Sequence, residues 1–135
     1  MNLEFSNNPA SQDIDFLTQQ INKETLEFGS AHPFAFFIRD KNNTIIAGCN
    51  GSVIYGAIYT DQLWVDPSHR KQGLAQSLMN KVHAYGREQG CRMATVATMS
   101  FQGAQRFYEK LGYLVDFTRT GYVNDSNCLF MIRKL

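Results

Sequence analysis

With 135 residues and a mass of 15.3 kDa, the chain is long enough for one hydrophobic core and short for two, so we expect a single domain over residues 1–135. Its 44% hydrophobic and 19% charged residues are typical of a globular protein and exclude a disordered one. The formal net charge of +1 comes from 13 basic and 12 acidic residues that form no run, which argues against a nucleic-acid partner.

The N-terminal residues lack the basic and apolar regions of a signal peptide, and no apolar run approaches the roughly 20 residues of a membrane helix. We therefore expect a cytoplasmic protein without a membrane partner. The three scattered histidines have no metal-ligand spacing, so no metal site is predicted. Three widely spaced cysteines without a CxxC pair are predicted to be reduced core thiols: Cys49, Cys91 and Cys128.

The first half of the chain predicts one helix and several antiparallel strands. Residues Asn2 to Phe5 indicate a short strand, and Asn-Asn-Pro followed by Ser11 indicates a turn and a helix start. Apolar residues at helical spacing from Ile14 onward predict that this helix continues to Gly29. The β-branched and aromatic segment from Phe34 to Thr60, with a turn at Asn42-Asn43, predicts two or three strands. DQLWV, Asp61 to Val65, is a further strand whose first, third and fifth residues share one face if no bulge intervenes.

The second half alternates helices and strands. An apolar stripe from Leu74 to Tyr85 predicts a helix, and the apolar run from Met93 to Met99 predicts a strand covered on both faces. A short helix from Ala104 to Leu111 and two closing strands follow. The order predicts a mixed α/β fold of the α+β class. Its sheet is largely antiparallel, with one central parallel pair made by a right-handed crossover, and with flanking helices.

The segment RKQGLAQ, Arg70 to Gln76, joins an Asp-Pro turn to the predicted helix and is a candidate anion site. The first amides of a helix have no internal partner, and its dipole adds about half a positive charge there. Gly73 lets an anion approach the backbone, while Arg70 and Lys71 add positive charge. On spacing alone, an ordinary turn with a glycine that eases packing explains the segment equally well. The chain lacks the GxxxxGK[ST] and GxGxxG motifs of nucleotide-binding folds.

A resemblance to a known family favours the anion site. The R-x-x-G-x-A pattern at Arg70 to Ala75, preceded by Leu-Trp-Val and Asp-Pro, resembles the pyrophosphate-binding motif of the GNAT superfamily of acyl-CoA-dependent N-acyltransferases. FYEKLGY, Phe107 to Tyr113, is similar to the family's terminal motif, and the two motifs stand in the family's order. The resemblance extends from about Phe34 to the C-terminus. It is greatest to a small single-domain subgroup related to histone-acetyltransferase paralogues.

The resemblance implies a GNAT fold, acetyl-CoA (coenzyme A) as the acyl donor, and no metal. In the family, a strand end holds the pantetheine arm and the following loop amides wrap the pyrophosphate. Many members also have an asparagine near the position of Phe101; this chain lacks it, and Ser100 or Gln102 is expected to replace it. The strand-end and loop contacts carry over onto Leu63, Trp64, Val65, Arg70, Lys71, Gln72, Gly73, Leu74, Ala75 and Gln76.

Acyl transfer to an amine requires a proton donor for the leaving thiolate and a route for the amine proton. Tyr108 resembles the family's general acid, which gives its proton to the coenzyme A sulfur; periodicity alone favours a tyrosine at the edge of the core. The amide of Val65 is the matching candidate for the carbonyl oxygen. Asp61 stands where family members carry an acidic residue that receives the amine proton through water. The alternative is a solvated aspartate, because an ordinary aspartate is a weak base.

The predicted partner is an amine acceptor, and nothing in the sequence distinguishes a protein amine from a small molecule. The last strand, Cys128 to Leu135, is expected to be an exposed edge that pairs with a second subunit in a homodimer. An alternative function is a non-catalytic acyl-CoA-binding sensor or regulatory module, which the missing asparagine suggests. Four aromatic residues are expected to be core rather than acceptor pocket: Tyr55, Tyr59, Trp64 and Phe101.

Overall fold

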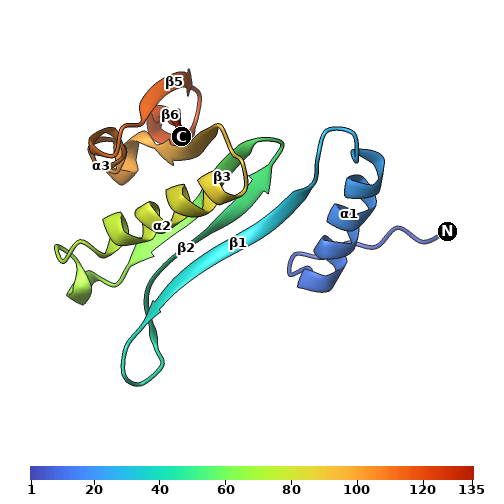
Figure 1. Ribbon diagram of the computed structural model, residues 1–135, viewed down its shortest axis with the longest axis horizontal. Helices are drawn as coiled ribbons and strands as arrows, with labels where there is room; N and C mark the ends of the chain where they lie inside the picture. Colours follow the sequence, from blue (N-terminus) through green and yellow to red (C-terminus); the bar gives the residue numbers. More distant parts are fainter.

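Six strands form one mixed sheet in the order β1-β2-β3-β4-β6-β5, in the computed structural model of residues 1–135 (Figure 1). The strands are β1 (Ala31–Arg39), β2 (Ile45–Ile54), β3 (Ala57–Val65), β4 (Met93–Met99), β5 (Leu114–Arg119) and β6 (Cys128–Lys134). The helices are α1 (Ser11–Glu24), α2 (Leu74–Glu88) and α3 (Gln105–Lys110). Only β3 and β4 pair in parallel, so the predicted mixed fold with a central parallel pair is confirmed.

Helix α2 covers one face of the sheet and forms the core with it. Its apolar stripe packs on inward-facing residues of the central strands, among them Ile58, Ala94 and Val96, which are almost fully buried. Burial of such side chains is the main stabilising term of the fold. The three cysteines are free and buried, as predicted. None of the helices is long and apolar enough to span a membrane. The buried residues of α2 are Leu78, Met79, Val82, His83 and Gly86.

A bulge interrupts β3 at Asp61. Asn50 of β2 lies opposite Gln62, but the next residue, Gly51, lies opposite Thr60, so Asp61 has no partner across the ladder. Because an extra residue reverses the alternation of side chains, the even-numbered residues of β3 face the core before the bulge and the odd-numbered ones after it. The sequence predicted Asp61 and Leu63 on one face of the strand, provided that no bulge intervened. Because a bulge is present at Asp61, this prediction does not apply.

The bulge also marks the point where β3 and β4 part. Their parallel pairing ends at Thr60 opposite Val96, although β3 continues to Val65 and β4 to Met99. The two strand ends therefore splay, and neither has a ladder partner on the side that faces the other. This opening positions the candidate site.

Three sequence predictions are wrong. Asn2 to Phe5 forms no strand and extends away from the sheet as irregular chain (Figure 1). Asp61 to Val65 is not a separate strand but the second half of β3. The last strand is not an edge, because β6 lies between β4 and β5 and both of its sides are paired; the edges are β1 and β5. A homodimer cannot form by pairing along β6.

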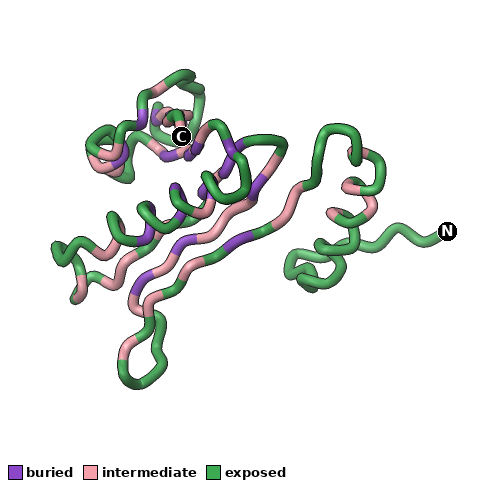
Figure 2. The backbone as a smooth tube through the Cα atoms, viewed as in Figure 1, coloured by how far each residue is buried: buried purple, intermediate pink, exposed green.

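Helix α1 differs from α2 in having no buried residue (Figure 2). It ends at Glu24, earlier than the predicted Gly29, and a turn leads from it to β1. Its apolar stripe, from which the helix was predicted, is exposed.

Candidate active site

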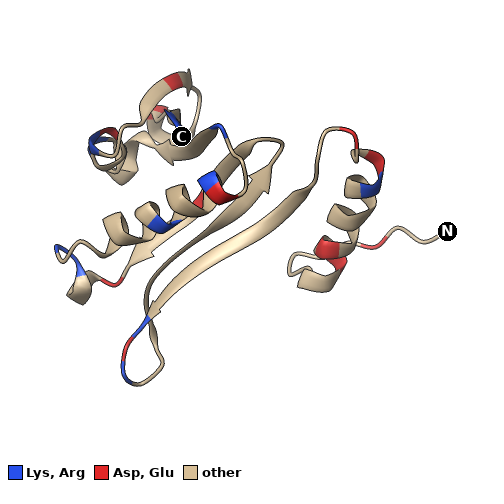
Figure 3. Cartoon of the chain, in the orientation of Figure 1, with Lys and Arg blue, Asp and Glu red and all other residues tan.

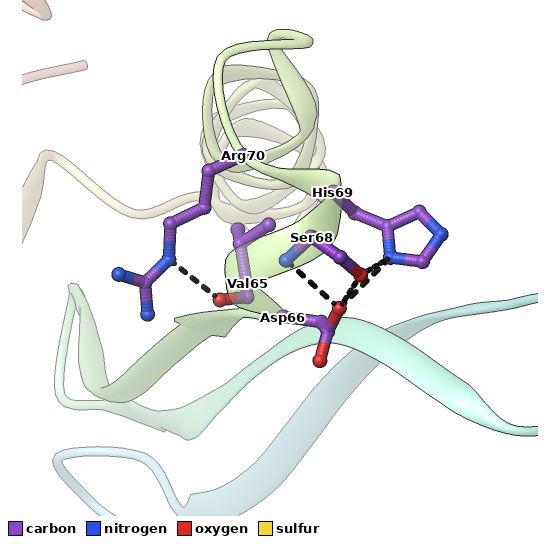
Figure 4. A network of polar contacts seen from close by, with 5 residues as sticks. All are labelled: Val65, Asp66, Ser68, His69 and Arg70. Atoms are coloured by element: carbon purple, nitrogen blue, oxygen red, sulfur yellow. Dashed lines mark hydrogen bonds and ion pairs between the residues drawn. The ribbon is translucent and has the colours of Figure 1, made fainter.

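The segment between β3 and α2 is held by a network of side-chain contacts (Figure 4). The carboxylate of Asp66 accepts from the amide of Ser68 at 3.1 Å, contacts the Ser68 hydroxyl, and lies 3.0 Å from Nδ1 of His69. The hydrogen bonds from Ser68, and then those from His69, lower the pKa of the Asp66 carboxyl. Arg70 donates from Nε to the carbonyl of Val65 at 2.9 Å. The predicted turn is thus tied to the end of β3.

The N-terminus of α2 leaves its first amides free. Gly73, the residue before the helix, has φ of 77°, and no side chain caps the helix. A methyl group on Gly73 would meet no heavy atom within 4 Å, so the space in front of these amides is open. The amides face a cavity of about 250 Å³. The dipole of α2 and the neighbouring side chains of Arg70 and Lys71 make this cavity suitable for an anion. Its lining residues are Val65, His69, Arg70, Lys71, Gly73, Leu74, Ala75, Gln76 and Phe107.

Two further cavities continue from this one along the opening between β3 and β4. The middle one, about 390 Å³, shares Val65, Arg70 and Phe107 with the first and is also lined by Tyr108. The last, about 520 Å³, shares Tyr108 and Arg70 with the middle one. We call the three together the splayed cleft. Gln72 and Ser100 do not line it. The last cavity is lined by Asp61, Gln62, Leu63, Trp64, Arg70, Ala97, Thr98, Gln102, Ala104 and Tyr108.

The end of β3 turns backbone donors toward the splayed cleft. The amide of Asp66 donates to the carbonyl of Ile46 on β2 at 2.8 Å. Because bonded and non-bonded residues alternate along an antiparallel ladder, the amides of Val65 and Leu63 point away from β2. On that side β3 no longer pairs with β4, so these amides are available to a ligand.

Tyr108 lies on α3, where its ring packs in the core and also lines the splayed cleft. It is 7% exposed, and its ring packs edge-on against Tyr113 with centroids 5.5 Å apart. The hydroxyl makes no hydrogen bond within the protein. Burial, and then the nearby thiol of Cys49, raise the pKa of Tyr108 to about 12. The phenol is therefore protonated at neutral pH, and it is buried more deeply than a residue at the edge of the core.

Asp61 lies at the bulge, exposed, and lines the same cavity as Tyr108. Its carboxylate accepts from the hydroxyl of Tyr59 at 3.5 Å. The pKa of Tyr59 is raised, mainly by burial and then by this carboxylate. The fold thus brings an acidic group and a protonated phenol into one cavity, as the family resemblance implied.

The two candidates for the missing asparagine differ in position. Gln102 lines the splayed cleft, and its side-chain oxygen accepts from the amide of Met99 at 2.8 Å. Ser100 points elsewhere: its hydroxyl accepts from the amide of Asn127 at 2.9 Å. Only Gln102 is placed to reach a ligand.

The prediction that four aromatic residues are core is wrong for three of them. Tyr55 is 49% exposed, Trp64 47% and Phe101 65%, and Trp64 lines the cleft. The sequence also missed several cleft residues, most of them on β4 or near α3. The predicted parallel pair was the signal that could have indicated the end of β4. The missed residues are Gln62, His69, Ala97, Thr98, Gly103, Ala104 and Phe107.

The chain matches the Acetyltransferase (GNAT) family over residues 3–113 and therefore belongs to this family of acetyltransferases. It is 33% identical over 81 residues to blasticidin-S acetyltransferase of Streptomyces morookaense; the match covers 59% of this chain and 59% of that relative, less than two thirds of its length. The predicted family is confirmed.

Solved structures agree with this fold. An acetyltransferase from Bacillus cereus has a TM-score of 0.75 at 20% identity, covering 98% of both chains. A Bacillus anthracis protein in complex with acetyl coenzyme A has a TM-score of 0.69 at 16% identity, covering 76% of this chain and 62% of that one. At these identities the likeness establishes the fold alone.

Proposed function

We propose that the protein is an N-acetyltransferase that binds acetyl-CoA in the splayed cleft and transfers the acetyl group to a primary amine of a small molecule or protein. One observation carries the proposal: free amides before α2, inward amides at the end of β3, and the protonated Tyr108 all face one continuous run of cavities. Relatives named as acetyltransferases and the neighbour in complex with acetyl coenzyme A support the choice of donor.

The residues that line the splayed cleft match the successive parts of acetyl-CoA, from one end of the cleft to the other. The amides from Gly73 to Gln76, with Arg70 and Lys71, hold the pyrophosphate, because they combine free donors with positive charge. The amide of Leu63 holds the pantetheine arm, and the amide of Val65 is assigned to the thioester carbonyl. Trp64 and Gln102 line the wall further in, next to Tyr108. No step requires a metal.

Bound acetyl-CoA supplies a thioester whose carbonyl carbon is attacked by the amine as the carbon–sulfur bond breaks. The amide of Val65 donates to the carbonyl oxygen. Tyr108 donates its O–H to the sulfur. Full proton transfer from a phenol of pKa about 12 to a thiolate whose thiol has an ordinary pKa of roughly 8.5 is uphill by about 5 kcal/mol. Tyr108 therefore acts mainly by hydrogen bonding to the sulfur as negative charge develops there.

Asp61 is assigned to the binding and deprotonation of the acceptor amine. Its exposed carboxylate attracts a cationic amine and orients a water that takes the proton lost by the nitrogen. The roles of Asp61 and Tyr108 thus differ: one deals with the incoming amine, the other with the leaving sulfur.

Two measurements test the proposal. Acetyl-CoA and coenzyme A should raise the melting temperature, while ATP and NAD should not, because only a ligand of the folded state stabilises it. Incubation with acetyl-CoA and a panel of amines should then release free thiol. No difference between acetyl-CoA and ATP would contradict the assigned cleft. Binding without turnover by any amine would instead support the acyl-CoA sensor, which the missing asparagine suggests.

A further inference from the structure

Helix α1 turns its apolar stripe to solvent. Three residues at helical spacing, Ile14, Leu17 and Ile21, are 47%, 57% and 51% exposed. The less exposed residues of the helix are polar: Thr18, Gln20 and Asn22. A helix on the surface of a monomer normally has the opposite arrangement, with its apolar stripe on the core. This stripe therefore lacks a partner within the chain.

The helix is held at one end only. The side chain of Asn22 makes two hydrogen bonds with the backbone of Ala31, its Nδ2 donating to the carbonyl and its Oδ1 accepting from the amide, both at 2.8 Å. The hydroxyl of Tyr55 donates to Thr25 at 3.3 Å. These contacts place the end of α1 against the start of β1, while the helix stands beside the sheet (Figure 1). The exposed stripe of α1 therefore lies beside its own sheet and does not cover it.

The sheet has an uncovered apolar groove on the face opposite α2. Its volume is about 640 Å³, and it extends over β1, β2 and the end of β3. The side-chain oxygen of Asn50, which lines the groove, is buried without a hydrogen-bond partner. An unsatisfied buried acceptor costs about 1–3 kcal/mol, and the amide side chains of α1 are suitable donors. The groove is lined mainly by Pro33, Ala35, Phe37, Gly48, Asn50 and Trp64.

The N-terminal segment and the rest of the chain also differ in net charge. Residues 1–30 contain one basic and five acidic residues, a net charge of −4. Residues 31–135 contain 12 basic and seven acidic residues, a net charge of +5, and these sum to the +1 of the whole chain. Acidic residues lie at both ends of α1, while the ribbon of β1 is almost free of charge up to Arg39 (Figure 3). Arg39 lies at the rim of the groove, over the ring of Phe37 at 5.8 Å. Opposite net charge favours association of one copy's N-terminal segment with residues 31–135 of another copy.

We propose that the protein forms a homodimer in which α1 of each copy lies in the groove of the other. The exchange buries both apolar stripes, brings donors to Asn50, and keeps the Asn22 bonds intact. The groove shares Gln62 and Trp64 with the innermost cavity of the splayed cleft, so the partner's α1 forms a wall beside the candidate site. The proposal rests on the exposed helix and the groove and does not depend on the acetyltransferase reaction.

Sedimentation of the full chain over a range of concentrations tests the dimer. We expect a species of twice 15.3 kDa. Leu17→Asp should raise the dimer dissociation constant at least tenfold, whereas Gln19→Asp, which adds the same charge to the exposed opposite side of α1, should change it less than threefold. A monomer at all concentrations, or a dimer that both variants leave unchanged, would overturn the proposal.

A mixing experiment distinguishes exchange from folding back. A nitroxide is attached at Gln19→Cys, because the three natural thiols are buried. The spin-labelled protein, which contains nitrogen at natural isotopic abundance, is mixed with ¹⁵N-labelled wild type. We expect line broadening at the amides of Ala35, Phe37 and Gly48 of the ¹⁵N chain. Broadening of these amides only when spin label and ¹⁵N are in the same chain would show that α1 covers its own sheet, and would overturn the exchange.

Discussion

The ring nitrogen Nε2 of His83 lies 2.8 Å from the hydroxyl of Tyr113. Arg133 donates to the other nitrogen, Nδ1, at 2.9 Å, and because a guanidinium can only donate, Nδ1 must accept. Nε2 therefore carries the proton and donates to Tyr113, whose ring packs against Tyr108. This buried contact links α2, which holds the anion site, to the phenol assigned to the leaving sulfur.

Stability should fall in mild acid because of His83. Burial, and then the charges of Arg133 and Arg87, lower its pKa to about 4 from an ordinary 6.5. Between pH 6.5 and about 4, His83 is thus protonated in the unfolded chain but neutral in the folded chain. The stabilisation is complete above pH 6.5 and is lost as the pH falls toward 4, at most about 3 kcal/mol. Urea denaturation at pH 7.0 and 4.5 should show a drop about 2 kcal/mol larger in the wild type than in His83→Gln. An equal drop in both would assign it to other groups.

Tyr108→Phe should lower kcat about 10²-fold and leave the dissociation constant of acetyl-CoA unchanged within twofold, because the ring stays packed and only the donor is lost. Thiol release and isothermal titration measure the two quantities. Tyr122→Phe, an exposed tyrosine outside the cleft, is the matched control and should retain full activity. Full activity of Tyr108→Phe would remove this residue from the chemistry.

The elements that follow from local signals were predicted closely. Helix α2 was recognised from side-chain periodicity and from the glycines at its end, and strand β4 from its apolar run. The loop from Arg70 to Gln76 was recognised from a consecutive motif. Each depends on residues near one another in the chain. The same holds for the anion cavity, whose predicted residues line it except for Gln72.

The features that depend on distant partners could not be predicted in this way. The bulge at Asp61 arises from its register against Asn50 and Gly51, and a strand's own sequence does not define its register. The interior position of β6 depends on the order of strands in the sheet. Trp64 was assigned to the core from its hydrophobicity, but the face of the sheet on which it lies is not covered by α1.

Gly73→Ala should weaken acetyl-CoA binding specifically. Gly73 has φ of 77°, so alanine costs about 1 kcal/mol in backbone strain, and its methyl group enters the space assigned to the pyrophosphate. Gly90, after α2, has φ of 76° and equally open surroundings, so Gly90→Ala carries the same strain away from the cleft. Both variants should lose similar stability in urea, but only Gly73→Ala should bind acetyl-CoA at least tenfold more weakly. Equal affinities would place the anion elsewhere.

Gly51→Ala should be the most destabilising substitution in the sheet. A methyl group on Gly51 would lie 1.8 Å from the carbonyl oxygen of Tyr59, a backbone atom that cannot move without separating β2 from β3 at the bulge. We expect a loss of more than about 3 kcal/mol, beyond ordinary overpacking. Gly48→Ala is the control on the same strand. Its closest contact, at 2.8 Å, is the exposed ring of Phe37, which can turn aside at a cost of about 1 kcal/mol. Because the bulge opens the splayed cleft, folded Gly51→Ala should also lose its thermal shift with acetyl-CoA, whereas Gly48→Ala should keep it. Similar unfolding free energies and similar thermal shifts for the two variants would show that neither the bulge nor the cleft requires glycine at position 51.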